Sequence, residues 1–249
     1  MGEVERTAPE KLAWLTARPI AHRGLHDPEK RIYENTLSAC EAAVAGNFAI
    51  EIDVQASADG EAMVFHDADL RRMCGLNEPV ASLTCAELSR IHILDSDDTI
   101  RSLPKILKAV SGDVPVIVEL KDNTEHNAAL AEAVAEAARS YTGRIAVMSF
   151  SHEIISMLVE QHCPCPIGLV ALGDDEMADE HQKAFEHPIS FISYDVKELP
   201  NEFVARARRE RSMPVISWTV RTTEQATVTY EHGDQITFEG FDPDAISDK

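Results

Sequence analysis

Short runs of apolar and β-branched residues, each bounded by turn residues, recur along the chain between Pro19 and Glu239. Most of these runs are continuous rather than alternating, which is typical of strands buried on both faces of a parallel sheet. The runs are Ile20–His22, Phe48–Val54, Ala62–His66, Val114–Leu120, Ile145–Phe150, Ile167–Ala171, Ile189–Val196, Val215–Val220 and Gln235–Glu239. The pattern therefore predicts a largely parallel sheet.

Stretches of helical composition lie between many of the predicted strands, the clearest being Asn35–Ala45, Glu125–Tyr141, Glu153–Gln161 and Asn201–Arg211. A repeated order of strand and helix predicts an α/β fold. A chain of 249 residues lies within the size range of one barrel of eight strand–helix units. We therefore expect a single TIM-like (β/α)₈ barrel domain over residues 1–249.

The barrel is expected to be irregular after its second strand. Only Gln55–Glu61 separates the second and third predicted strands, which is too short for a helical crossover. The Asp59-Gly60 pair is a turn signal, so this junction is either a hairpin or a barrel unit without its helix. Residues 68–104 then form a small excursion after the third strand, in which Thr84 to Glu87 reads as a capping box.

The formal net charge of −20 argues against a nucleic acid or an anionic membrane as a partner. Binding to phosphate backbones normally needs a surplus of lysine and arginine. A small anionic substrate must then be attracted locally, and a bound divalent cation is one way to invert the local potential.

The apolar runs and the cysteines of the sequence also indicate in which cellular compartment the protein is expected. No apolar run of about 18 residues occurs, and residues 1–18 lack the apolar stretch of a signal peptide. The five cysteines are odd in number and irregular in spacing, which favours free thiols in a reducing compartment. We expect a cytoplasmic protein without stable membrane association, whose oligomeric state the sequence does not define.

Pairs of charged residues stand within or at the ends of several predicted strands. Glu51 and Asp53 are two residues apart, so a strand places both carboxylates on one face. Glu119 and Lys121 share a face in the same way at the end of a later strand. Two carboxylates that point into a barrel are costly unless they are paired with lysine or arginine or bind a cation such as Ca²⁺ or Mg²⁺. An isolated pair of this kind more often has the first explanation.

Two histidines follow predicted strands, His22 before Arg23 and His66 before Asp67. The carboxyl ends of barrel strands are where such enzymes place catalytic groups. Two imidazoles there suit an acid and a base, and a neighbouring guanidinium suits a phosphate. The chain contains no H-E-x-x-H, nucleophile elbow, dinucleotide-binding or Walker motif, so the common enzyme classes that carry them are not indicated.

As a set, these residues resemble the glycerophosphodiester phosphodiesterase family, which is related in fold and site to phosphatidylinositol-type phospholipases. The resemblance extends from about Pro19 to Glu239 with the motifs in the family's order. The matching segments are Ala21-His22-Arg23-Gly24, Glu34-Asn35-Thr36, Glu51-Ile52-Asp53-Val54, Asp59-Gly60, Phe65-His66-Asp67, Leu103-Pro104, Glu119-Leu120-Lys121 and Trp218-Thr219-Val220.

The resemblance implies a metal site and an acid/base pair. Glu51, Asp53 and Glu119 would bind one divalent cation, Ca²⁺ or Mg²⁺. His22 and His66 would exchange acid and base roles during hydrolysis. In the mechanism proposed for the family, a glycerol hydroxyl attacks phosphorus and water then opens the resulting cyclic phosphate, giving glycerol 3-phosphate and an alcohol.

The resemblance also implies how the substrate is held. Arg23 and Lys121 would contact the phosphate, Glu34 and Asn35 would support the site, and Trp218 would line the pocket for the alcohol. The substrate would be a small glycerophosphodiester.

Three positions depart from the family's usual residues: Tyr33, Arg221 and Glu239. We interpret these departures as affecting the alcohol side of the substrate, with Arg221 favouring a more anionic group. Two other functions stay open. One is a lysophospholipase D-like phosphodiesterase, which would need a surface that faces lipid. The other is a non-catalytic module that binds phosphodiesters on the same barrel.

Overall fold

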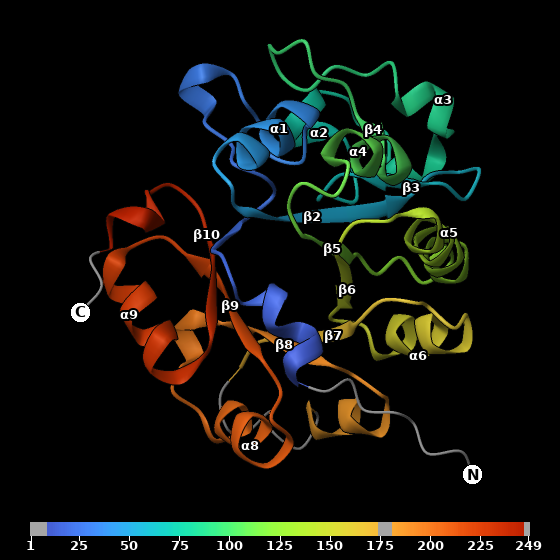
Figure 1. Ribbon diagram of the computed structural model, residues 1–249. Coiled ribbons are helices and arrows are strands. Elements are labelled where there is room, and N and C mark those ends of the chain that lie inside the picture. Colours follow the sequence, from blue (N-terminus) through green and yellow to red (C-terminus); the bar gives the residue numbers. More distant parts are fainter. Residues whose placement is uncertain (1–8, 174–180, 247–249) are drawn as a thin grey trace.

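The computed structural model describes residues 9–173 and 181–246. Within these residues eight parallel strands close into a barrel, because β1 pairs with both β10 and β2 (Figure 1). The barrel strands, in spatial order, are β1 (Ile20–Ala21), β2 (Ala49–Ala56), β5 (Val116–Leu120), β6 (Ile145–Ser149), β7 (Ile167–Ala171), β8 (Phe191–Asp195), β9 (Val215–Val220) and β10 (Gln235–Phe238). The predicted TIM-like barrel is confirmed.

Two apolar layers hold the strands. On β2, Ile50, Ile52 and Val54 point outward into the large cluster between the strands and the helices. Residues of the opposite face fill the barrel interior, where Leu15 of the N-terminal 3₁₀ helix (Pro9–Leu15) joins the smaller cluster. Because side chains alternate along a strand, Glu51 and Asp53 face this interior. The interior layer therefore ends in charged residues.

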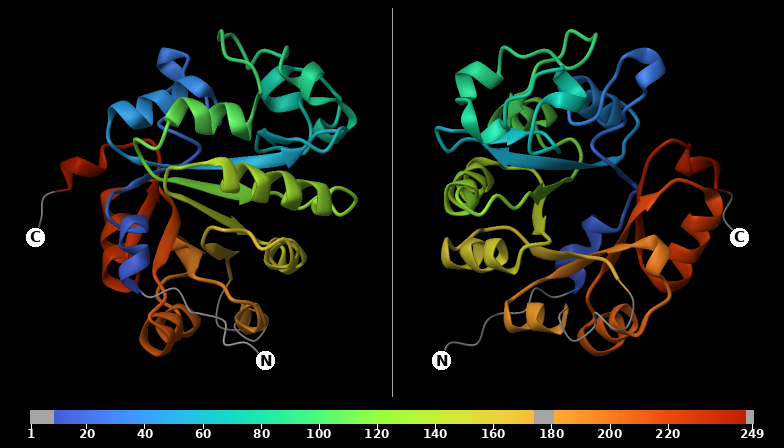
Figure 2. Two further views of the ribbon diagram at one scale, coloured as in Figure 1. Left: turned by 45° about the vertical axis from the view of Figure 1, so that its right-hand side comes forward. Right: turned by 180° about the vertical axis from the view of Figure 1, so that it is seen from behind.

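Helices surround the strands (Figure 2). The four predicted helices are present as α1 (Leu37–Ala45), α5 (Asn127–Ser140), α6 (His152–Glu160) and α8 (Glu202–Arg211). Thr36, Ser151 and Asn201 cap α1, α6 and α8 by accepting a backbone N–H bond.

Among the described residues, two further helices beside the barrel strands were not predicted, and neither was the short helix Arg71–Cys74. In α9 (Thr223–His232), threonine and valine lower the helix propensity that a sequence pattern relies on. In α4 (Leu103–Val110), the proline at the start fits the first helical turn, where its missing N–H costs nothing.

The third predicted strand is not part of the barrel. Residues Ala62–Val64 form β3, which runs antiparallel to β2, and β4 (Arg101–Ser102) extends this edge antiparallel to β3. The assignment of 62–66 to a barrel strand is therefore wrong, and the hairpin alternative is confirmed. The turn brings the chain back along β2, where the Phe65 N–H bonds the Asp53 carbonyl at 3.0 Å. His66 thus reaches the mouth of the barrel from an antiparallel strand.

The excursion packs as a small layer over this edge, beside α1 and α4 (Figure 2). It begins at β3 rather than at Ala68, because Met63 and Phe65 belong to its own buried cluster with Leu70, Leu88 and other residues. The layer includes α2 (Arg71–Cys74) and α3 (Cys85–Leu88), and the predicted capping box of Thr84 and Glu87 is present.

All five cysteines are free thiols, as expected, although Cys40 alone among them is fully buried. Among the described helices, none combines the length with the apolar character that crossing a bilayer requires.

Candidate active site

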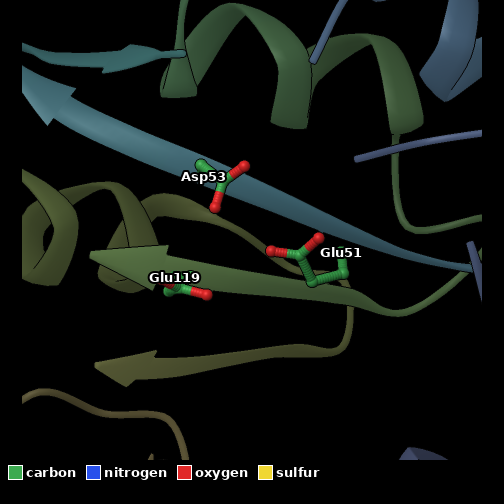
Figure 3. A group of neighbouring side chains, drawn as sticks. All are labelled: Glu51, Asp53 and Glu119. Atoms are coloured by element: carbon green, nitrogen blue, oxygen red, sulfur yellow. The ribbon is translucent and has the colours of Figure 1, made fainter. Parts of the chain in front are cut away.

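Three carboxylates meet at the inner face of the barrel (Figure 3). Glu51 and Asp53 lie on β2, and Glu119 lies on β5 in register with Asp53. One ligand oxygen from each residue lies within 4.8 Å of the other two, and all three side chains are buried. We call these residues the acidic cluster. Their meeting follows from the direct pairing of β2 with β5, which the hairpin makes possible by placing β3 at the outer edge.

Cations and amides surround the acidic cluster. The Lys121 ammonium contacts Glu119 and lies 2.8 Å from Asp53. The Asn35 amide donates to Asp53 Oδ2 at 2.8 Å, and the Asn35 carbonyl oxygen accepts the Asp53 N–H. Burial tends to raise the pKa of Asp53, but Lys121 and Arg23 outweigh it, so this pKa falls below its usual value.

The pKa values of the other two carboxyl groups, Glu51 and Glu119, are raised. Burial raises the pKa of Glu51 well above its ordinary value, and the neighbouring carboxylates of Asp53 and Glu119 raise it further. Burial and the charge of Asp53 raise the pKa of Glu119 to about 7. Ionisation of all three carboxyl groups therefore has a free-energy cost that Lys121 and Arg23 do not fully offset.

A divalent cation fits this arrangement. Glu51 Oε2 accepts the Arg23 N–H at 2.9 Å, whereas Glu51 Oε1 is buried and has no hydrogen-bond partner among the described residues. A buried carboxylate oxygen without a partner is costly. Because Ca²⁺ and Mg²⁺ prefer carboxylate oxygens, the acidic cluster has the donor set and the free oxygen that such an ion would use.

On one side of the acidic cluster, His22 forms a chain of contacts with a carboxylate and an arginine. His22 Nδ1 lies 2.6 Å from Glu239 Oε2, and Arg221 Nη2 lies 2.6 Å from Glu239 Oε1. His22 Nε2 lies 4.0 Å from Glu51 Oε2. Burial lowers the pKa of His22 more than Glu239 raises it. A neutral His22 that donates from Nδ1 presents an accepting Nε2 to the cluster.

On the other side, His66 has an equivalent arrangement. His66 Nδ1 lies 2.7 Å from Asp67 Oδ1, and Arg72 Nε lies 2.7 Å from Asp67 Oδ2. Burial lowers the pKa of His66 as well. We call the two sets, His22 with Glu239 and Arg221 and His66 with Asp67 and Arg72, the histidine triads. In each, the arginine helps keep the carboxylate ionised, so that the carboxylate orients the imidazole.

A cavity of about 260 Å³ opens over these groups. Its lining includes both histidines, Glu51, Glu119 and Lys121. Trp218 and Phe150 form an aromatic side, with ring centroids 5.6 Å apart in an edge-to-face contact. A larger cavity of about 680 Å³ lies between the N-terminal segment and α8 and contains none of the predicted site residues.

Every residue predicted for the site lies in or directly behind the smaller cavity. Behind it, Glu34 accepts from Arg23 at 2.7 Å and from Arg72 at 2.7 Å, which ties the loop after β1 to the excursion. The sequence did not indicate Arg72. Asp67 stood in a quoted motif without a role, and Glu239 was noted only as a departure.

The model of the glycerophosphoryl diester phosphodiesterase family matches residues 22–238. The chain belongs to this family. The resemblance expected from about Pro19 to Glu239 is thereby confirmed.

Relatives in the glycerophosphoryl diester phosphodiesterase family are distant. The protein YqiK of Bacillus subtilis, described as uncharacterized, is 29% identical over 55% of this chain and 60% of its own length. Lysophospholipase D GDPD1 of Rattus norvegicus is 26% identical over 73% of this chain and 64% of its own. The match thus spans less than two thirds of either relative.

A solved structure supports the barrel. The phosphodiesterase of Oleispira antarctica, in complex with the product sn-glycerol-3-phosphate, superposes with a TM-score of 0.78. It is 20% identical, over 93% of this chain and 96% of that one. At this identity the likeness establishes a common fold.

The three departures from the usual family residues occupy different places. Tyr33 donates a hydrogen bond to Asp95 of the excursion at 2.5 Å. Glu239 contacts His22, so it acts directly on this imidazole, and its expected effect on the alcohol side of the substrate stays a prediction. Arg221 binds Glu239, which partly neutralises the charge that we expected to favour an anionic substrate. Two of the departures therefore concern the setting of His22.

The loop that carries His22 and Arg23 depends on Gly24. This glycine has φ of +80°, and an added Cβ would lie 2.8 Å from the Ala39 Cβ. We expect Gly24→Ala to destabilise the protein by more than about 2 kcal/mol, from backbone strain and steric overlap together. Gly75→Ala is the matched control, because Gly75 has φ of +69° but open space around it. Equal losses of melting temperature in the two variants would contradict a contribution from steric overlap between the added Cβ and Ala39 of α1.

We expect Arg72 to support catalysis by holding Asp67 and Glu34 in place. Arg72→Ala should lower kcat about tenfold with a smaller change in KM, since Asp67 and Glu34 would lose their common partner. Arg71→Ala is the control, because Arg71 is exposed and pairs with Asp69. Steady-state kinetics of both variants and of Arg72→Lys, which should recover part of the rate, test this prediction. Equal effects at positions 71 and 72 would contradict it.

Proposed function

We propose that the protein is a metal-dependent phosphodiesterase that hydrolyses glycerophosphodiesters to glycerol 3-phosphate and an alcohol. The observation that carries this proposal is one cavity in which two histidine triads flank a buried acidic cluster. Membership of the glycerophosphoryl diester phosphodiesterase family supports it. The product in the Oleispira antarctica structure, sn-glycerol-3-phosphate, is the one that this reaction would release.

In this proposal, Glu51, Asp53 and Glu119 hold one Ca²⁺ or Mg²⁺ ion. The bound cation would neutralise phosphate oxygens and stabilise the charge that develops on them. Arg23 and Lys121 project from the same rim and supply positive charge for the phosphate.

Residues behind the rim keep these groups in place. Glu34 orients the Arg23 guanidinium, and Asn35 fixes Asp53 through two hydrogen bonds. Trp218 lines the side of the cavity that would receive the alcohol. Preorganised charges of this kind need no rearrangement during the reaction.

The two histidines divide the proton transfers. In the first step one imidazole takes the proton of a glycerol hydroxyl as its oxygen attacks phosphorus, and the other gives a proton to the alcohol oxygen as its bond to phosphorus breaks. In the second step the roles are exchanged, because water must lose a proton and the glycerol oxygen must regain one. Each Nδ1 is held by a carboxylate, so each Nε2 is the atom available for transfer.

A second candidate function is hydrolysis of lysophospholipids. It is favoured by the position of Phe150, which lines the cavity with 41% of its surface exposed, where an acyl chain could leave the site. The name of the rat relative, lysophospholipase D, points to the same substrate class.

Phosphorus NMR tests both candidates. Purified protein is incubated with glycerophosphoglycerol, glycerophosphoethanolamine and lysophosphatidylcholine, each with Ca²⁺ or Mg²⁺. The proposal predicts a glycerol 3-phosphate signal from the first two substrates. Lysophosphatidic acid from the third as the main product would favour the second candidate, and no turnover of any substrate would favour a non-catalytic binding module.

A further inference from the structure

The cavity has two chemically different sides because of the strand order. Counting around the barrel, three strands separate β8 from β2 in either direction, and three separate β9 from β5, among the described residues. The acidic cluster stands on β2 and β5. The opposite side is therefore built by β8 and β9, from which Asp195, Lys197 and Trp218 line the cavity. A substrate with its phosphate at the cluster extends its other group toward β8 and β9.

Lys197 differs from the other cations of this cavity. It lies in the short 3₁₀ helix Val196–Glu198 directly after β8, and its side chain is exposed. Its ammonium forms no ion pair with any residue that the structure describes. Each of the other arginines and lysines that line the cavity has a carboxylate partner: Arg23 with Glu34, Lys121 with Asp53 and Arg221 with Glu239. Lys197 thus has a positive charge available for a ligand.

Asp195 provides a negative charge beside it. Asp195 Oδ1 accepts the Lys197 backbone N–H at 2.9 Å, which fixes the carboxylate at the base of the same short helix. Asp195 also lines the cavity. A purely anionic group would be repelled by this carboxylate, whereas a group with one positive and one negative charge would meet a partner for each.

We propose that Lys197 and Asp195 select glycerophosphodiesters whose alcohol carries a carboxylate next to an ammonium group. The inference rests on the proposed function, since it assigns the substrate class of the same cavity. Lys197 binds the carboxylate of this alcohol and Asp195 faces its ammonium, while Trp218 covers the carbon atoms between them. Lys197 is a specificity-determining residue in this account and takes no part in the proton transfers.

The test compares three substrates that differ in the alcohol alone. Glycerophosphoserine carries both charges, glycerophosphoethanolamine lacks the carboxylate, and glycerophosphoglycerol is uncharged on this side. We expect wild type to prefer glycerophosphoserine over glycerophosphoethanolamine by about tenfold in kcat/KM, as a charge-assisted contact at a partly exposed site allows. Lys197→Ala should remove this preference while changing kcat/KM for glycerophosphoglycerol less than about twofold. Lys197→Arg should keep it.

The control variant and the possible outcomes distinguish a failure of this inference from a failure of the proposed function. Lys105→Ala replaces an exposed lysine of α4 that does not line the cavity, and it should retain the wild-type preference. Equal rates of wild type on glycerophosphoserine and glycerophosphoethanolamine would overturn the inference while leaving the proposed function standing, as would an unchanged preference in Lys197→Ala. A wild type that hydrolyses none of the three substrates would overturn the proposed function, and the inference with it.

Discussion

Replacing His22 by alanine is expected to lower kcat/KM for glycerophosphodiesters by about 10² or more, with the fold intact. A positioned acid/base group contributes about 10² to 10⁴ in rate. The structure gives His22 this position, because Glu239 holds Nδ1 at 2.6 Å and leaves Nε2 facing the acidic cluster. The measurement is the initial rate of glycerol 3-phosphate release at saturating and at low substrate. His66→Ala should show a loss of the same order.

A histidine without this setting serves as the control. His92 is exposed, lies in the excursion and does not line the cavity. His92→Ala should keep the wild-type rate, and circular dichroism of all three variants should match that of wild type. Activity of His22→Ala within about threefold of wild type would contradict the assignment of His22 to proton transfer.

Replacing Glu51 by glutamine is expected to have two opposite effects. Activity should fall by about 10² to 10³, because the variant loses one of the three carboxylates that hold the cation. The melting temperature of the metal-free protein should rise at pH values where Glu51 is ionised, because the variant removes one buried charge and its repulsion. Differential scanning fluorimetry with EDTA and with added Ca²⁺ measures the second effect.

The raised pKa values of Glu51 and Glu119 also make the stability of the metal-free protein depend on pH, with a definite sign. Glu51 and Glu119 have raised pKa values in the folded protein, so each binds its proton more tightly folded than unfolded. These two groups therefore contribute a loss of stability to the metal-free protein as pH rises from the ordinary carboxyl pKa through their raised values, which for Glu119 is about 7. Glu51→Gln should reduce this loss. Glu41→Gln, at an exposed position on α1, is the control, and an equal rise in melting temperature there would contradict the account.

The barrel was predictable because its strands are continuous apolar runs separated by helices of good propensity. The acidic cluster was predictable for a related reason. Glu51 and Asp53 interrupt an apolar strand at a spacing of two, and charges inside a buried strand need an explanation. The pairing of β2 with β5, which adds Glu119, was not visible, since the sequence does not show which strands are neighbours.

The remaining parts of the site depend on contacts between distant segments. Glu239 lies 217 residues from His22 in the chain, and only closure of β10 against β1 brings the two together. Arg72 stands beside Arg71 in an excursion without regular periodicity, and nothing in the local pattern shows which of the two points to the site. The antiparallel course of β3 follows from one turn, at Asp59-Gly60, whose outcome the sequence left open.

The most direct measurement removes and restores the cation. Wild type and Asp53→Asn are stripped with EDTA, freed of the chelator, and assayed for glycerol 3-phosphate release from glycerophosphoglycerol before and after addition of Ca²⁺ or Mg²⁺. The account predicts that stripped wild type is inactive, that one of the two ions restores it, and that the variant stays inactive with both. Full activity of the stripped wild type, or restoration of Asp53→Asn to the wild-type rate, would contradict a cation site at the acidic cluster.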